Sequence, residues 1–295
     1  MKPIPKIDIH VHSMLRRAVP RPNGTFYTTP DELRGMYDRL GVERGVNLPI
    51  VSPECAHCYL TTEEACQMAQ RYPETYLFFC NIDPRMGGND PGTDFVPLLE
   101  HYKALGARGV GELTANLAID DPRLWALFGA AEQCGMPVLF HIGRPVYGDY
   151  GLIDRPGLPG LERALVRFPS LVFLGHSQKF WAEIGGGLEE QDRDGYPQGP
   201  VTRGGRVIEL MDRHPNLHGD LSAHSGYNAL ARDVEFGCAF VERYQDRLYF
   251  GTDICCPQDD MRLSYWLDEM ANSRRISRQA YEKVCRGNAE RLLGI

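Results

Sequence analysis

Few features of this sequence point to a membrane, a nucleic acid or a secreted scaffold. The 295 residues contain no apolar run long enough to span a bilayer, and the first apolar segment begins so near Met1 that no signal peptide is expected before it. Acidic residues outnumber basic ones, 39 to 32, and no Lys/Arg-rich run suggests a phosphate-binding surface. We therefore expect no membrane, no nucleic acid and a small-molecule substrate, with association into a homodimer left open.

The cysteines do not form the pattern of a disulfide scaffold. There are nine, an odd number, spread over expected strands, helices and loops. The segment Cys55-Ala56-His57-Cys58 lacks the second ligand pair of a structural zinc site and the surroundings of a redox motif. We interpret it as a loop at the mouth of a site, in a reduced, cytoplasmic protein.

Short apolar strands alternate with amphipathic helices along the whole chain. The expected strands are Lys6–His12, Val46–Val51, Tyr76–Ile82, Arg108–Leu113, Pro137–His141, Leu171–Gly175, Asn216–Leu221 and Arg247–Gly251. Polar or Gly-rich loops are expected over Ser13–Thr29 and Gly185–Gly205. This alternation predicts an α/β protein with a closed (β/α)8 TIM barrel, a single domain over residues 1–295. An open doubly wound sheet is the alternative, but no Gly-x-Gly-x-x-Gly follows a strand.

The first expected strand carries two histidines in a His-x-His motif. Its period-two alternation sends Ile7, Ile9 and Val11 to one side, and Asp8, His10 and His12 to the other. In a parallel barrel we expect the apolar side to meet the helices and the polar side to point inward. With nine histidines in the chain, roughly 0.3 such pairs arise by chance, so the motif needs support from the other strands.

That support comes from the carboxyl ends of the expected strands, where the active sites of such barrels lie. The residues there are His10, His12, Glu112, His141, His176, Asp220 and Asp253. Taken singly, each has a structural explanation as a buried histidine, a helix cap or a turn residue. Taken together, these side chains are the ligand types of a divalent metal. His101, His214 and His218 lie on expected helices or at strand starts and receive a structural interpretation.

Five segments resemble the amidohydrolase superfamily, in particular its amidohydrolase-related branch, which includes non-oxidative decarboxylases. They are Ile7–His12, Met136–His141, Leu174–His176, Leu248–Asp253 and Gly287–Leu293. The resemblance implies that His10, His12, His141 and Asp253 bind a metal, zinc or alternatively manganese. It also implies that His176 binds a second metal or orients the attacking water, and that Asp253 accepts the proton of that water. Asp253 and His176 are thus the expected catalytic residues.

Glu112 departs from the superfamily members in which a lysine bridges two metals. Gly111-Glu112-Leu113 is more similar to the Gly-Glu motif of the deoxyribonuclease-like branch, where a glutamate bridges two metals. The number of ions therefore stays open: the site holds either one ion with Glu112 beside it or two ions bridged by Glu112. The negative charge of Glu112 favours a second cation and opposes a substrate carboxylate. We therefore expect a hydrolase of a small amide, lactone or ester-like substrate, with a zinc-dependent decarboxylase of an unsaturated or aromatic acid as the alternative. A barrel that only binds a ligand is disfavoured because the ligand set is complete.

The substrate pocket is expected on the loops that follow the strands. Arg144, three residues past His141, is expected to bind a substrate carboxylate, because its guanidinium matches that group in two hydrogen bonds. The weaker candidates for the pocket wall are Tyr147, Trp181, His57 and His224.

Overall fold

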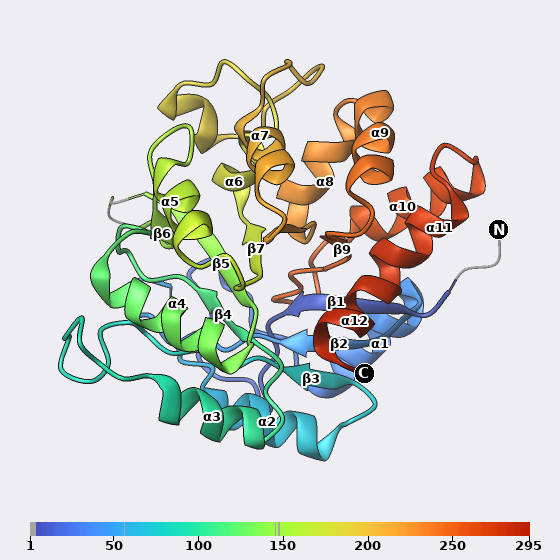
Figure 1. Cartoon of the computed structure of the whole chain (residues 1–295). Coiled ribbons are helices and arrows are strands. Elements are labelled where there is room, and N and C mark those ends of the chain that lie inside the picture. The colour runs from blue at the N-terminus through green and yellow to red at the C-terminus, as the bar shows by residue number, and fades with distance from the viewer. Residues whose placement is uncertain (1–3, 56, 145, 147) are drawn as a thin grey trace.

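Eight parallel strands form the centre of the computed structural model, which describes residues 4–55, 57–144, 146 and 148–295 (Figure 1). The strands are β1 (Lys6–Val11), β2 (Val42–Asn47), β3 (Tyr76–Phe78), β4 (Val110–Leu113), β5 (Val138–Gly143), β7 (Phe173–His176), β8 (Leu217–Asp220) and β9 (Leu248–Tyr249). β1 to β3 form one sheet, and β4, β5 and β7 to β9 form the other. The bridges Cys80–Val110 and Val11–Ile254 join the two sheets into a ring. The short β6 (Leu152–Ile153) pairs with β5. The expected single-domain TIM barrel is confirmed.

The helices surround this ring in Figure 1. They are α1 (Pro30–Leu40), α2 (Thr62–Arg71), α3 (Val96–Ala104), α4 (Pro122–Cys134), α5 (Pro159–Arg167), α6 (Gln178–Ala182), α7 (Arg206–Arg213), α8 (Ala223–Ala231), α9 (Val234–Tyr244), α10 (Arg262–Asn272), α11 (Arg278–Glu282) and α12 (Asn288–Leu293), with the single turns η1 (Glu190–Asp194) and η2 (Lys283–Gly287). Local sequence explains several starts: Thr29 and Glu32 form a capping box at α1, and Asp121 caps α4. Among the described residues, no helix is both long and apolar enough to cross a bilayer.

The structure corrects the bounds of the expected second strand and contains a helix, α8, that was not expected. The second strand is Val42–Asn47 rather than Val46–Val51, because its polar first half pairs with β1, with Val42 opposite Lys6. Helix α8 was not expected, since it contains Gly226 and Asn228, which are poor helix formers. Gly226 is required there by packing: a Cβ at this position would lie 2.1 Å from the carbonyl oxygen of Leu221.

The barrel interior and the layer between strands and helices hold separate apolar clusters. The interior cluster contains Ile7, Ile9, Val46, Leu48, Phe79, Leu139, Leu174 and Tyr249, with Ala289 and Leu293 of α12. The outer cluster joins the alternate strand residues, such as Val138, Phe140 and Val11, to the helices. The expected outward direction of Ile7 and Ile9 is therefore wrong, whereas that of Val11 is correct.

Asp8 also lies on the opposite side from the one expected. Its carboxylate accepts a hydrogen bond from Tyr37 Oη of α1 at 2.7 Å, so it faces the helices rather than the interior. The register of β1 against β2 shifts between Asp8 and Val11. This irregularity breaks the simple alternation and allows His10 to point into the barrel although Ile9 does so too.

Candidate metal centre

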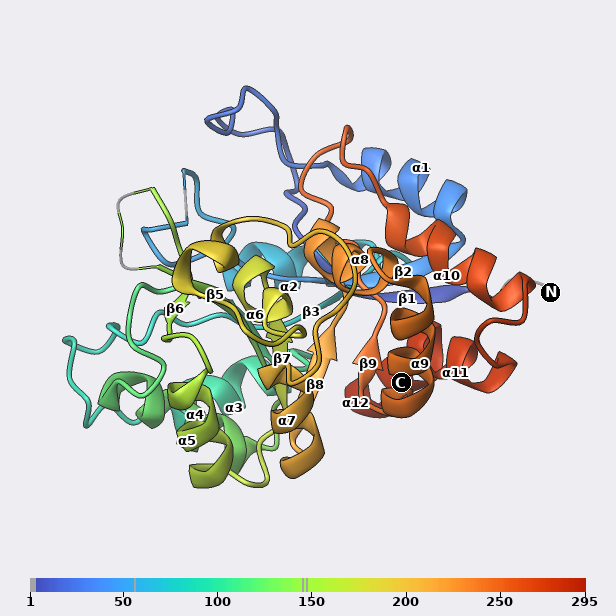
Figure 2. The same cartoon turned by 90° about the horizontal axis from the view of Figure 1, so that it is seen from above.

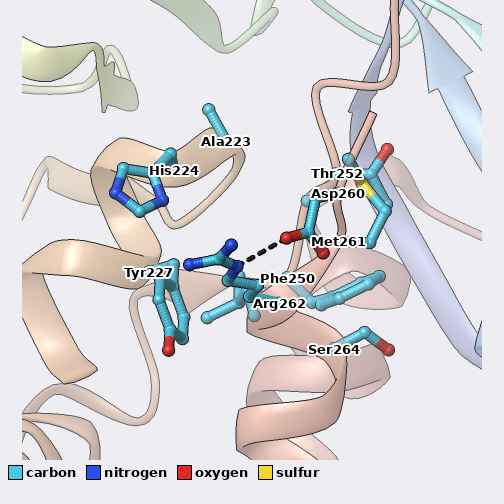
Figure 3. A pocket seen from close by; sticks show the side chains of 11 residues that line it. Ala223, His224, Tyr227, Phe250, Thr252, Asp260, Met261, Arg262 and Ser264 are labelled. Atoms are coloured by element: carbon cyan, nitrogen blue, oxygen red, sulfur yellow. Dashed lines mark hydrogen bonds and ion pairs between the residues drawn. The ribbon is translucent and has the colours of Figure 1, made fainter. Parts of the chain in front are cut away.

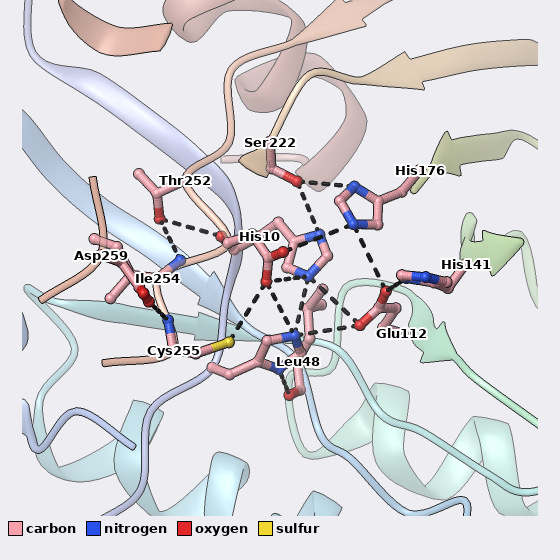
Figure 4. Close-up of polar contacts among 12 residues, drawn as sticks. His10, Leu48, Glu112, His141, His176, Ser222, Thr252, Ile254, Cys255 and Asp259 are labelled. Carbon is pink, nitrogen blue, oxygen red and sulfur yellow. Dashed lines mark hydrogen bonds and ion pairs between the residues drawn. The ribbon is translucent and has the colours of Figure 1, made fainter. Parts of the chain in front are cut away.

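His10 and His12 bring their Nε2 atoms to within 3.0 Å of each other at the carboxyl end of β1 (Figure 4). Both side chains are buried. Glu112 Oε2, from the end of β4, lies 3.6 Å from His10 Nε2 and 3.2 Å from His12 Nε2. Asp253 Oδ1, from the loop after β9, lies 3.4 and 3.6 Å from the same two nitrogens. Four side chains from three strand ends thus converge on one point.

These separations fit a divalent metal. Ligand bonds of 2.0–2.1 Å in a tetrahedral zinc site place neighbouring ligand atoms about 3.4 Å apart. The donors are imidazole nitrogens and carboxylate oxygens, which suit zinc and manganese. Within the part of the chain that the structure describes, every cluster of three or more metal-capable side chains includes His10, His12 or Glu112.

The second carboxylate oxygen of Glu112 faces a different pair of histidines. Glu112 Oε1 lies 2.8 Å from His141 Nδ1, at the end of β5, and 3.8 Å from His176 Nε2, at the end of β7. Asp253 Oδ2 also lies 3.8 Å from His176 Nε2. Glu112 therefore stands between two groups of donors, with one oxygen toward each. This arrangement is suited to two metal ions.

Behind the donors, Asp220 and Ser222 hold two of the imidazoles. Asp220 Oδ2 lies 2.7 Å from His10 Nδ1 and 3.2 Å from His176 Nδ1. Ser222 Oγ lies 3.2 Å from His10 Nδ1 and 3.0 Å from His176 Nδ1, and it also donates to Asp220. His12 Nδ1 is fixed instead by the carbonyl oxygen of Leu48 at 2.8 Å. These contacts leave Nε2 of each ring directed at the donor cluster.

The charges in the cluster shift its proton equilibria. Burial alone would lower the pKa of His10, but the carboxylates of Asp253, Asp220 and Glu112 raise it well above its usual range. Burial would raise the pKa of Glu112, yet His10 and the hydrogen bonds with His12 and His141 hold it well below its usual range. A metal ion has to displace such protons, so its affinity falls as the pH falls.

A cavity of about 400 Å³ opens onto this cluster. Its lining includes the donors His12, Glu112 and Asp253 beside Arg21, Tyr27, Cys55, His57 and Tyr150. A neighbouring cavity of about 360 Å³ shares Arg21, Asp253 and Cys255 and adds His224 and Arg262. Figure 3 shows a pocket that adjoins this cavity, where Arg262 forms an ion pair with Asp260 near His224 and Tyr227. The two spaces fall in the usual size range of small-molecule sites.

The expected metal ligands His10, His12, Glu112, His141, His176 and Asp253 are brought together. Only some of the candidates for the pocket wall line the two cavities. His57 and His224 line the cavities, while Tyr147 lies outside the described residues. Arg144 lines neither cavity, because its guanidinium is bound to Asp149 and Asp194.

Trp181 is a core residue rather than part of the pocket wall. Its ring is buried against Phe180 and Phe240, and its Nε1 donates to the carbonyl oxygen of Asp220 at 2.8 Å. The sequence-based expectation placed it on a loop, but α6 turns it back toward β8. Its role in the site is therefore indirect, through the strand that carries Asp220.

Three residues of the site were missed from the sequence. Ser222 lies two positions past Asp220, so the strand period offered a signal for it. The ring of Tyr150 is tilted by 43° against that of His141, with 4.6 Å between the ring centroids, and Arg21 comes from the loop between β1 and α1. Nothing in their local sequence places Tyr150 or Arg21 at the site, since long loops position both.

A family model described as Amidohydrolase matches residues 7–295. The curated proteins contain no match to this chain. Among solved structures, a TIM-barrel protein from Bordetella bronchiseptica is similar, with 20% identity, 99% of each chain covered and a TM-score of 0.66. A 2,6-dihydroxybenzoate decarboxylase from Rhizobium has 17% identity, 99% of each chain covered and a TM-score of 0.59. A putative 2-pyrone-4,6-dicarboxylic acid hydrolase from Pseudomonas putida has 17% identity, coverage of 99% of this chain and 98% of that one, and a TM-score of 0.62.

Proposed function

The chain belongs to the amidohydrolase family, and on this premise we propose that it is a metal-dependent hydrolase of a small amide, lactone or ester-like substrate. The observation that carries the proposal is the position of Glu112, which directs one carboxylate oxygen at His10 and His12 and the other at His141 and His176. A carboxylate with this position favours two cations over one.

Two groups of residues would hold the ions, which we expect to be zinc or manganese. His10, His12 and Asp253 form the first group, and His141 and His176 form the second, with Glu112 shared between them. When bound, divalent ions of this kind polarise a carbonyl group and make water a strong nucleophile at neutral pH.

Asp253 is the residue placed to accept the proton of the attacking water. Its side chain is 24% exposed, whereas those of His10 and His12 are buried, so it contacts the donor cluster and also lines the cavity. It can therefore take a proton inside the site and release it toward solvent. His176 is held from behind by Ser222 and Asp220, and its Nε2 lies 3.8 Å from Asp253 Oδ2. From there it would support the developing charge or the leaving group.

Decarboxylation of an unsaturated or aromatic acid is the second candidate. The observation in its favour is Arg21, a cation in the cavity wall that would offset the charge of a substrate carboxylate near Glu112 and Asp253. Both reactions use the same donors, so the donors do not decide between them.

Turnover in ¹⁸O-labelled water separates the two reactions. The metal content of the purified protein is measured first, and lactones, amides and aromatic acids are then screened with the metal-loaded enzyme. Hydrolysis places the label in the new carboxylate or hydroxyl of the product. Release of CO2 without label in the remaining product would contradict the hydrolase and support the decarboxylase.

A further inference from the structure

Arg21 comes from a long loop and lines the same cavity as the donors His12, Glu112 and Asp253. The loop between β1 and α1 projects from the body of the barrel in Figure 2. Its tip is a tight turn in which Arg21 N donates to Thr25 O at 2.7 Å. Its base is tied down, because Thr28 N donates to Cys255 O at 3.0 Å, next to the strand end that carries Asp253. The loop thus connects Arg21 to the frame of the site.

The guanidinium of Arg21 has no carboxylate partner among the described residues. Its one side-chain contact of note is the ring of Tyr27, whose centroid lies 5.2 Å away. Other arginines near the site are paired: Arg85 with Asp83 and Glu54, and Arg262 with Asp260. Burial opposes the charge of Arg21, and the nearby Asp259 offsets part of that charge without forming an ion pair. The hydrogen-bonding groups of the guanidinium are therefore available to an anion bound in the cavity.

The cavities show where such an anion would lie. Arg21, Asp253 and Cys255 are shared by the cavity of about 400 Å³ and the cavity of about 360 Å³, so Arg21 stands where the two meet. Arg144 offers no comparable position, because two carboxylates already occupy its guanidinium.

We propose that Arg21, stacked on Tyr27, binds a carboxylate of the substrate and determines specificity for a small monoanionic ring or acyl compound. The planar fork of a guanidinium matches a carboxylate in two parallel hydrogen bonds, and the Tyr27 ring holds the fork in place. A phosphate dianion fits less well, since a single guanidinium stands among Glu54, Asp253 and Asp259. The claim that this anion is the substrate rests on the proposed function. The claim that Arg21 binds a carboxylate does not.

The test compares two isosteric probes, benzoate and benzamide, by calorimetry on the metal-loaded protein. We expect the wild-type protein to prefer benzoate. Arg21→Gln should weaken benzoate binding by about tenfold or more, because a hydrogen bond to a charged group is lost, and should leave benzamide unchanged. The benzoate affinity of Arg21→Lys should lie between those of the wild type and Arg21→Gln, since lysine keeps the charge but lacks the planar guanidinium. Arg16→Gln, at an exposed position on the same loop, and Arg144→Gln should match the wild type.

A second measurement does not depend on the variants folding. Phenylglyoxal modification of the wild-type protein, mapped by mass spectrometry, should be slowed by benzoate at Arg21 and not at Arg16. The proposal is overturned if Arg21→Gln binds benzoate as the wild type does, if Arg144→Gln is weakened equally, or if the wild type binds benzoate no better than benzamide. The two proposals can fail separately. If the wild-type protein takes up no metal, yet Arg21→Gln still weakens benzoate binding, the proposed function is refuted and this inference stands.

Discussion

His10 Nδ1 lies 2.7 Å from Asp220 Oδ2, and neither side chain is exposed to solvent. Burial alone would raise the pKa of Asp220, but His10 and the hydrogen bonds from both histidines lower it strongly. Asp220 is therefore ionised and holds the proton of His10 on Nδ1, which leaves Nε2 free to bind a metal. We therefore expect the carboxylate to act on a bound metal through the orientation and proton of His10.

Asp220→Asn should lower metal affinity by roughly ten- to a hundredfold without emptying the site, because the amide orients His10 less strictly. Competition with a chelator measures this affinity. Asp212→Asn is the control. Asp212 is a carboxylate on α7 whose side chain contacts Arg243 and Tyr244 and none of the candidate metal donors. Equal affinity in Asp220→Asn and the wild type would show that the contact has no part in binding.

Glu112→Gln should reduce the metal content from about two ions per chain to about one. The amide keeps the shape of the side chain but removes the charge that faces His141 and His176. Elemental analysis of the purified variant measures the stoichiometry. Glu54→Gln is a matched control, because Glu54 lines the same cavity but is bound to Arg85. Two ions retained in Glu112→Gln would contradict the bridging position.

The double variant His10→Ala with His12→Ala should copurify with less metal than the wild type and retain the helical content of the barrel. Both imidazoles are donors in the same cluster, whereas the apolar interior of the barrel is formed by Ile7, Ile9 and their neighbours. Elemental analysis and circular dichroism measure the two properties together. Full metal occupancy in this variant would refute the assignment of both ligands.

Trp181→Ala should destabilise the fold by about 3–5 kcal/mol, as expected for removal of a buried aromatic side chain. The ring packs on Phe180 and Phe240 and lines neither cavity. Urea unfolding measures the loss, and Trp181→Phe, which keeps most of the ring contacts, should lose less. If Trp181→Ala has the free energy of unfolding of the wild type but a raised KM, Trp181 is part of the pocket wall, as the sequence suggested.

His218 should make the fold less stable as the pH falls from about 6.5 to about 4. Burial, with a smaller effect of Arg247, lowers its pKa to about 4 in the folded protein, whereas the unfolded chain takes up the proton near its ordinary value. The unfolded state therefore binds more protons in this window, and stability decreases there by a total on the order of 3 kcal/mol. Above the window both states are neutral and the effect is absent.

The measurement is urea unfolding at several pH values, taken as the difference between the wild type and His218→Gln. That difference should change across the window, because the variant has no imidazole to titrate. Tyr249→Phe, which removes the hydroxyl 2.9 Å from His218 Nδ1 but keeps the imidazole, should retain the pH dependence of the wild type. This account is refuted if the difference in free energy of unfolding between the wild type and His218→Gln stays constant with pH.

The sequence by itself determined the barrel and which side chains gather as candidate metal donors. Strand–helix alternation leads to a parallel ring, and a parallel ring gathers the carboxyl ends of all strands at one face. His10, Glu112, His141 and Asp253 are therefore neighbours for topological reasons, and their chemistry could be inferred before their distances were known.

Only the tertiary structure decided which way the side chains turn and what each one contacts. His10 points into the barrel beside Ile9 because β1 shifts its register against β2, and a periodicity argument does not contain such a shift. Arg144 and Arg21 are both arginines on loops after strands. Asp149 and Asp194 bind the first, whereas the second lies over the Tyr27 ring and has no ion pair with any described residue. The difference has a physical reason: the partner of a loop side chain is set by residues distant in sequence, whose approach depends on how the whole chain packs.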